Sequence, residues 1–442
     1  MNRLDAACEK ILKLAGDTQC EVTAAASDSA LTRFAENAVS QNVASSLARY
    51  SVRLLDNGRC AKVAFDQADD ASLKRAMASA FDLLRSQKKE PGLLPLPKPK
   101  PLPAGADLYD PETAALTPAW RALKAAELAR ACARAGQTAC GTVENGASER
   151  VIASSTGVFA RHRDTYAVHS VTVKDGDGSG WAERYSWRAG EIPFSLVNET
   201  ARAKAAASRR PRALKPGRYA VLLEPNAAAE LVMMATAYGF GGQLYNEGRA
   251  YACGRLGKRV FGPLLTIVDN AVDGPAAGAP FDSEGMPKSK VTLVENGVLK
   301  AVVHDRKTAK KAGAASTGHA LPQPSYMGPL PTNVAVKPGR GSFEDLIRAT
   351  ERAVLVTQFH YTNMLRPEAL EMTGMTRNGT FLVEDGKIAC PVKNMRFTQS
   401  LGEAFASADA LCGEAPVVLG WGPIACPAMR LGSFNFSSAT EF

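Results

Sequence analysis

The residue types that most often carry enzymatic chemistry are sparse in this 442-residue chain. A helical zinc pair needs two histidines on one face, at a spacing of four or five positions, and no two histidines here have that spacing. Each is therefore more typical of a structural or surface residue than of a metal ligand. The five are His162, His169, His304, His319 and His360.

Other catalytic signatures are missing from the sequence. It contains neither the GxSxG elbow of serine hydrolases nor a Walker phosphate loop. The glycine-rich stretch GFGGQL (239–244) follows a predicted helix instead of a strand, so it lacks the geometry that cradles phosphate. The nine cysteines are scattered, with no CxxC pair and an odd total, which indicates reduced and mostly buried thiols.

One short motif, DGDGSG (175–180), begins like a calcium-binding loop. An EF-hand requires a bidentate glutamate at its twelfth position, and that position falls on Ser186. Strands rather than helices are predicted on both sides. The motif is therefore interpreted as a hairpin loop, and no metal site is predicted from it.

Composition and charge limit the kinds of protein that this sequence can encode. With 45% hydrophobic and 22% charged residues, no signal-peptide pattern and no apolar run of membrane-spanning length, the sequence predicts a soluble cytoplasmic protein. The net charge is +9, and the run 202–218 holds seven basic residues and no acidic one. Because this run lacks aromatic residues for base stacking, a solvated linker is favoured over a nucleic-acid contact.

The elements that must position any site suggest an α+β protein. A proline-rich stretch (90–113) and the basic run divide the chain into a small N-terminal α/β domain (1–90), a middle helix-plus-meander domain (106–212) and a β-rich C-terminal domain (216–442). Turn pairs Asn57-Gly58, Asn145-Gly146 and Thr156-Gly157 predict hairpins in the first two domains.

The C-terminal domain is predicted to surround a buried helix. Two stretches, 292–303 and 381–392, share the pattern of strand, acidic-Asx-Gly turn and strand, which predicts antiparallel hairpins. The helix itself (226–238) is apolar all round apart from Glu230 and Thr236, so burial at the centre of the domain is expected. We expect Asn226 to cap its start.

The glycines after this helix are interpreted as a helix stop. Gly239, Gly241 and Gly242 follow its last apolar residues. Glycine is favoured where the backbone needs a positive φ beyond a helix C-terminus, so we expect such angles here.

Several stretches resemble the TldD/PmbA (TldD/TldE) family. The resemblance is carried by FDSEGMPKSKVTLVENGVLKAVVHDRKTAKKAGAASTGHA (281–320), by PTNVAVKPGRGSFEDLI and GTFLVEDGKIACPVKNMRFTQSL, and by ALTRFAENAVSQNV (30–43) near the N-terminus. It covers nearly the whole chain. It implies a small α/β N-terminal domain, a middle region and a β-rich C-terminal domain.

The resemblance also implies that the central helix corresponds to a zinc-binding helix of the family. The TldD branch of the family consists of zinc metalloproteases with an HExxxH motif on this helix and a cysteine near the C-terminus as third ligand. Registering that motif on MMATAYGFGG (233–242) puts Met233 and Tyr238 at the two histidines and Met234 at the glutamate. A thioether binds zinc poorly and a neutral phenol must lose a proton of pKa near 10.

The sequence is therefore similar to the PmbA/TldE branch, which lacks this motif. Cys412 falls close to the position of the third ligand, but it cannot form a site alone. We predict no catalytic, metal-binding or cofactor-binding residues at these positions. Whether the chain is an enzyme by another route is left open.

Two classes of function follow from the resemblance. The first is a non-catalytic subunit that pairs with a TldD-like metalloprotease, as a heterodimer or larger complex, and acts on unfolded or short peptides; self-association is the fallback. The second is an independent enzyme with an unrecognised site, or a DNA-associated protein of the gyrase-modulator kind. The substitutions on the helix favour the first, and the basic run gives the second weak support.

Overall fold

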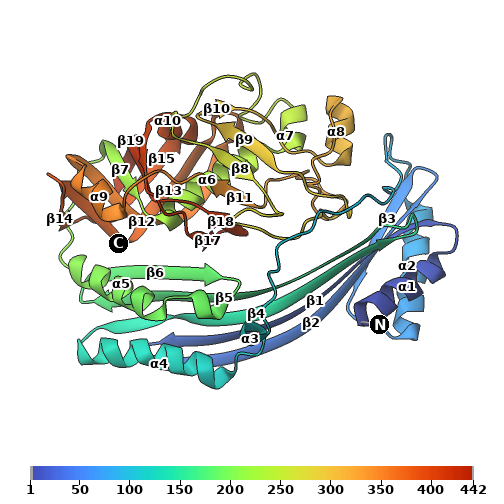
Figure 1. Cartoon of the computed structure of the whole chain (residues 1–442), viewed down its shortest axis with the longest axis horizontal. Helices are drawn as coiled ribbons and strands as arrows, with labels where there is room; N and C mark the ends of the chain where they lie inside the picture. The colour runs from blue at the N-terminus through green and yellow to red at the C-terminus, as the bar shows by residue number, and fades with distance from the viewer. Residues whose placement is uncertain (1–2, 441–442) are drawn as a thin grey trace.

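The computed structural model describes residues 3–440 and divides into a long curved sheet and a C-terminal body above it (Figure 1). The curved sheet has six antiparallel strands in the order β3-β2-β1-β4-β5-β6. Their bounds are β1 Gln19–Ala35, β2 Ala38–Asp56, β3 Arg59–Phe65, β4 Thr138–Ser154, β5 Phe159–Asp175 and β6 Gly178–Ser186. The predicted α+β class is confirmed.

This sheet combines the first two predicted segments. Residues 21–34 of β1 pair with residues 141–154 of β4, so the chain before the proline-rich stretch and the chain after it share one continuous sheet. The stretch itself follows the C-terminal body in an extended path, where the Ala106 N–H donates to the Val272 carbonyl at 3.1 Å. The two segments are thus joined by backbone hydrogen bonds along most of β1.

Two of the three turn predictions in this region are confirmed and one is wrong. Asn57 and Gly58 both have positive φ between β2 and β3, and Thr156-Gly157 joins β4 to β5. Asn145-Gly146 lies instead in the middle of β4. The Asn145 side chain is buried there, where it accepts a hydrogen bond from Arg121 at 2.7 Å, and a Cβ at Gly146 would lie 2.5 Å from the Tyr166 ring.

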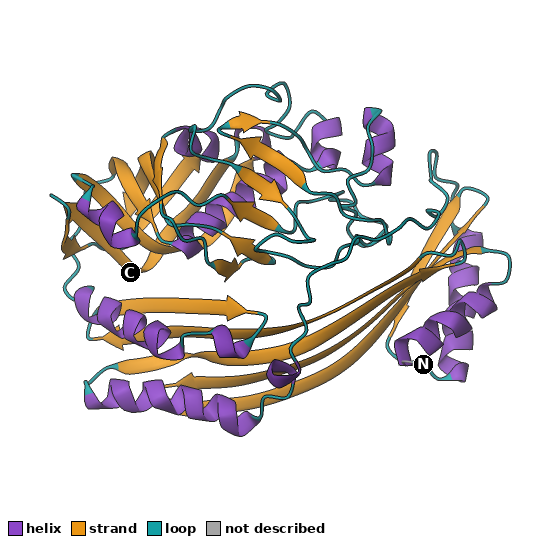
Figure 2. Cartoon of the chain, viewed as in Figure 1, coloured by secondary structure: helices purple, strands orange, loops and turns teal. Residues whose placement is uncertain are grey.

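Helices cover one face of the curved sheet (Figure 2). At the end of the sheet that carries β3, apolar residues of the first two helices, such as Leu4 and Leu73, pack against Val52 and Leu54 of β2. Thr117 caps the start of the fourth helix, since its side chain accepts from the Trp120 N–H. These helices are α1 Arg3–Ala15, α2 Asp70–Ser86, α3 Pro111–Ala114, α4 Pro118–Arg134 and, beside β6, α5 Phe194–Ala207 with the 3-10 turn η1 Ala189–Glu191.

The C-terminal body contains a closed barrel. Strands β12, β7, β19, β15 and β13 follow one another in one sheet, and β12 also pairs with β13, which closes the ring. Strand β14 extends β13, and β16 pairs with β19. The bounds are β7 Gly217–Leu223, β12 Arg352–Arg366, β13 Glu371–Glu384, β14 Lys387–Pro391, β15 Met395–Ser400, β16 Ala408–Leu411 and β19 Met429–Ala439.

A second sheet completes this body, in the order β10-β9-β8-β11-β18-β17. Both predicted hairpins are confirmed: Asn296-Gly297 joins β9 to β10 and Asp385-Gly386 joins β13 to β14, all four residues having positive φ. The remaining elements are α6 Pro225–Gly239, α7 Gly242–Asn246, β8 Ile267–Asp269, β9 Val291–Glu295, β10 Val298–Leu299, α8 Arg306–Ala312, β11 Val334–Val336, α9 Phe343–Arg348, η2 Pro367–Ala369, α10 Leu401–Ala406, β17 Val417–Leu419 and β18 Pro423–Ala425.

A buried cluster of charges ties the curved sheet to the C-terminal body. Arg53 of β2 forms an ion pair with Glu21 of β1 at 2.7 Å and approaches Glu284 of the C-terminal body at 3.7 Å. Arg306 reaches the same Glu284 carboxylate at 3.4 Å. Breaking one partner of such a buried set leaves an uncompensated charge, so the cluster favours one placement of the two bodies. Among residues 3–440, no helix has both the length and the apolar character needed to cross a membrane.

Candidate functional site

The candidate site is built around helix α6, whose burial is as predicted. Met233 is 7% exposed and Met234 3% exposed, and Tyr238 is half-buried against the same core. Of the two polar residues, Thr236 donates to the Met233 carbonyl at 3.1 Å and Glu230 accepts from the Thr362 hydroxyl. The helix is therefore held by apolar packing along most of its length.

The predicted N-cap of α6 is wrong, whereas the helix does end at Gly239, where the glycines begin. The N-cap residue is Glu224, with Pro225 in the first turn and no side-chain cap, so Asn226 already lies inside the helix. Pro225 explains this start, because its fixed φ suits the first turn and its missing N–H costs no hydrogen bond there.

The glycines after α6 serve a different purpose from the predicted one. Gly239, Gly241 and Gly242 do not have positive φ. A Cβ at Gly242 would lie 2.5 Å from Nδ1 of His304 and 2.6 Å from the Val303 carbonyl oxygen. A Cβ at Gly241 would lie 2.8 Å from the Pro329 carbonyl oxygen. Close approach of neighbouring chain, not left-handed backbone, requires glycine at these two positions.

A hairpin tip lies over the first of the three motif positions. The backbone N–H of Trp421, between β17 and β18, donates to the Met233 sulfur at 3.1 Å. A Cβ at Gly420 would lie 2.7 Å from that sulfur. The Trp421 side chain itself is 62% exposed. The tip therefore occupies the space directly outside Met233, with backbone contacting the sulfur and the indole facing outward.

Cys412 does not join this site. It packs with Leu222 and Leu355, whereas the neighbouring residues Val221 and Val354 on the same strands belong to the core around α6. Because side chains alternate between the two faces of a strand, the barrel wall separates Cys412 from Met233. Burial raises the pKa of the Cys412 thiol to about 11, which disfavours the thiolate that binds metal.

Another cysteine, Cys426, does belong to the core around α6, and sequence reasoning missed it. It is fully buried, and burial raises the pKa of its thiol. Cys426 directly follows the short strand β18, which belongs to the hairpin that covers Met233. The spacing of the cysteines in the sequence does not predict this position. Within residues 3–440, no group of three or more His, Cys, Asp or Glu side chains could hold a metal ion.

The histidines are spread over separate environments. His319 and Asp269 form a fully buried pair at 2.9 Å, and the other Asp269 oxygen accepts the N–H groups of Thr332 and Asn333. His169 bonds Asn198 at 2.8 Å. These contacts fix loops and helices in place. His304 adjoins Thr308, His162 lies 3.4 Å from Asp164, and His360 contacts Arg377.

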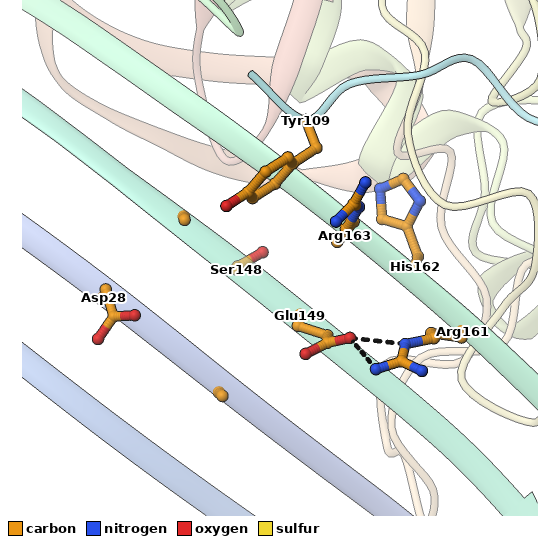
Figure 3. Close-up of a pocket in the computed structure, with 9 residues that line it drawn as sticks. Asp28, Tyr109, Ser148, Glu149, Arg161, His162 and Arg163 are labelled. Carbon is orange, nitrogen blue, oxygen red and sulfur yellow. Dashed lines mark hydrogen bonds and ion pairs between the residues drawn. The ribbon is translucent and has the colours of Figure 1, made fainter. Parts of the chain in front are cut away.

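A polar cavity of about 700 Å³ lies on the curved sheet (Figure 3). The Glu149 carboxylate in it pairs with Arg161, and the Arg163 guanidinium lies 4.3 Å from the centre of the Tyr109 ring. Ser148 donates to Asp164 rather than to His162, so the serine and histidine do not form a nucleophile and base pair. The cavity offers polar recognition by charged side chains, and no catalytic group is evident among these residues.

A second cavity of about 480 Å³ shares Ser148, Glu149 and His162 with the first and reaches the C-terminal body. Its far wall includes Asp282 and Lys288. The first cavity lies on the helix-covered face of the sheet, where Arg161 pairs with Asp5 of α1 at 3.2 Å, whereas the second lies on the face toward the body that holds α6.

Comparison with known proteins agrees with this architecture. The PmbA/TldA metallopeptidase C-terminal domain matches residues 216–438, and the central domain of the same family matches residues 107–209. The chain is 24% identical over 208 residues to a metalloprotease of Methanocaldococcus jannaschii, covering 46% of each protein. It is 24% identical over 240 residues to a metalloprotease TldD homolog of Haemophilus influenzae, covering 53% of this chain and 48% of that one. The chain thus matches about half the length of these relatives.

Solved structures share the complete fold. TldE from Thermococcus kodakarensis superimposes with a TM-score of 0.87 at 19% identity, covering 97% of this chain and 99% of that one. A putative modulator of DNA gyrase from Thermotoga maritima gives 0.84 at 18% identity, covering 98% and 99%. From the matched domains and the shared fold, the chain belongs to the TldD/PmbA family of metallopeptidase-like proteins.

Proposed function

We propose that this chain is a non-catalytic subunit of a TldD/TldE-type metallopeptidase complex in the cytoplasm, acting on unfolded or short peptides. The observation that supports the proposal is the set of residues at the motif positions of α6. The positions that correspond to the zinc motif hold Met233, Met234 and Tyr238, and a hairpin tip covers the first of them. None of these side chains supplies an imidazole ligand or a carboxylate base.

A subunit without catalytic groups contributes through its surface, and strand β2 offers a suitable one. Strand β3 pairs only with residues 50–56 of β2, which leaves residues 38–49 as an edge with no further strand beside it among residues 3–440. Val43 (40% exposed) and Leu47 (49% exposed) lie on the sheet face opposite to α1 and α2. An exposed edge with apolar residues beside it is suited to strand pairing with another chain.

The proposal is tested by co-expression with a TldD-like relative that retains HExxxH. We expect the two chains to elute together at micromolar concentration and the relative to cleave peptides faster or more selectively in the complex. The same relative with its motif glutamate replaced is the control, because it should still bind but not cleave. Separate elution, together with equal cleavage in the absence of this chain, would favour an independent function.

Metal content gives a separate test. We expect the purified protein to contain no stoichiometric zinc and to leave peptides intact by itself. Elemental analysis after purification without chelators measures this directly. About one zinc per chain that disappears in Met233→Ala or Tyr238→Ala would contradict the proposal.

A further inference from the structure

A cationic cavity of about 820 Å³ lies where the β5–β6 turn meets the outer face of the barrel, apart from α6 and from the two polar cavities. The charged and aromatic residues that line it are Arg377, Lys393, Arg396, His360, Tyr361 and Asp177. Asp177 belongs to the DGDGSG motif, which forms the predicted hairpin turn between β5 and β6.

Strand register places the two arginines together. His360 of β12 pairs with Met375 of β13, and Met375 pairs with Arg396 of β15, so these three residues form one row across the barrel. Arg377 lies two residues beyond Met375 and is exposed on the same outer face. Arg377 and Arg396 are thus diagonal neighbours, with Cβ atoms roughly 7 Å apart in ordinary sheet geometry.

The cavity carries excess positive charge. Among residues 3–440, no carboxylate forms an ion pair with Arg377, Lys393 or Arg396. The Asp177 carboxylate accepts the backbone N–H of Arg210 at 3.0 Å. Burial, and then the charge of Arg377, lowers the pKa of His360 below its usual value, which favours the neutral imidazole.

The basic run of the sequence forms the rim of this cavity. The Arg212 N–H donates to the Pro391 carbonyl at 3.0 Å, and the Lys393 N–H donates to the Arg212 carbonyl at 2.9 Å. Residues 202–207 belong to α5. The run is thus held beside the barrel, with Ser208 and Pro211 lining the cavity. Arg210 and Arg212 remain exposed, as expected of the predicted solvated linker.

We propose that this cavity binds an extended acidic segment of a peptide, with two carboxylates at alternate positions engaging Arg377 and Arg396. Alternate residues of an extended chain lie about 6.6 Å apart, which matches the diagonal spacing of the arginines. Guanidinium groups hold carboxylates through paired hydrogen bonds. The proposal rests on the proposed function for peptide as the ligand class, and it names the chemistry that this subunit selects.

The arrangement favours peptide over single-stranded nucleic acid. Binding of bases uses a series of aromatic platforms along a charged groove. Here the cations converge on one cavity, and Tyr361, 76% exposed, is the aromatic side chain at its edge. An oligonucleotide therefore serves as the competing ligand in the test.

The experiment is fluorescence anisotropy with a labelled seven-residue peptide of alternating threonine and glutamate, and with its glutamine counterpart. We expect the purified full chain to bind the glutamate peptide, with weakening as salt is raised. The double variant Arg377→Gln/Arg396→Gln should bind at least about tenfold more weakly, since two charge-assisted contacts are lost. Arg130→Gln, which removes one exposed charge from α4, should change binding by less than about twofold.

Several outcomes would overturn the inference. These are equal binding by the double variant with an unchanged melting temperature, equal binding of the glutamine peptide, or tighter binding of a single-stranded oligonucleotide that the double variant abolishes. The same measurements are repeated in a Glu441→Gln background. Glu441 follows the lining residue Thr440 in the sequence, and this change removes its carboxylate as a competitor of the peptide. Peptide binding is measured without the catalytic relative, so failure here is distinguishable from failure to form the complex.

Discussion

At Met234, the effect of a substitution on the free energy of unfolding depends on the polarity of the new side chain. The side chain is 3% exposed within the core around α6. We expect Met234→Leu to lower the free energy of unfolding by less than about 1.5 kcal/mol, since volume and polarity are nearly kept. Met234→Asp should cost on the order of 3 kcal/mol or more, because it buries a carboxylate without a partner. Urea denaturation of both variants measures the difference, and equal stabilities would show that α6 is not core.

Glu284 gives a second prediction at this scale, concerning pH. Burial raises the pKa of its carboxyl group from 4.5 to about 7, against the opposing effects of Arg306 and Arg53. A carboxyl group with a raised pKa in the folded state favours folding most below its unfolded pKa, and that contribution is lost as pH rises to the folded value. Stability should therefore decline between pH 4.5 and 7 by an amount on the order of 3 kcal/mol.

The matched variant is Glu284→Gln, which keeps the shape and removes the titration. We expect the stability of wild type relative to this variant to fall between pH 5 and 7 and to level off above pH 8. Urea denaturation at four pH values, with the two proteins compared at each, isolates this group from other titrations. A difference that stays constant with pH would contradict the assignment.

At the scale of elements, the junction between α6 and α7 depends on close packing. Gly242 is the first residue of α7, and a Cβ there would collide with His304 and with the Val303 backbone. We expect Gly242→Ala to destabilise the protein by about 1–3 kcal/mol, as overpacked sites do. Gly190 has open space around its Cβ position and no positive φ, so Gly190→Ala is the control and should stay within about 0.5 kcal/mol. Thermal unfolding of the two variants tests the contrast.

Hairpin β17–β18 and helix α6 act as one unit at the candidate site. The Trp421 N–H reaches the Met233 sulfur because a tight tip containing Gly420 and Gly422 lets the backbone approach it. The side chain at 233 is thereby enclosed by main chain as well as by the core. This enclosure is the structural basis for proposing that the subunit acts through its surface.

For the whole molecule, the exposed edge of β2 predicts where a partner binds. Val43→Arg places a charge beside that edge without disturbing the core, so we expect it to weaken co-elution with a TldD-like relative while the melting temperature of the isolated chain stays unchanged. Leu123→Arg, at an exposed apolar residue of α4, is the control and should leave the complex intact. Size exclusion of co-expressed pairs measures both, and loss of the complex in the α4 variant alone would place the interface elsewhere.

Local chemistry in the sequence determined many elements. Asn57-Gly58 and the two acidic-Asx-Gly turns predicted hairpins correctly, because two consecutive residues with positive φ favour those pairs strongly. The apolar character of 226–238 likewise predicted a buried helix. The family resemblance rested on long continuous stretches, and the matched domains support it.

The tertiary structure alone decided how distant segments combine. Pairing of β1 with β4 across more than a hundred residues, the placement of Cys412 behind the barrel wall, and the fixing of Arg212 beside Lys393 depend on register and topology. Asn145-Gly146 has the composition of a turn, yet it is held in a strand by a hydrogen bond from Arg121 to the Asn145 side chain and by close contact with Tyr166. Sequence predicts turns and buried faces because they follow from each residue's own conformational and solvation preferences. Which buried faces pack against one another depends instead on the packing free energy of the whole chain.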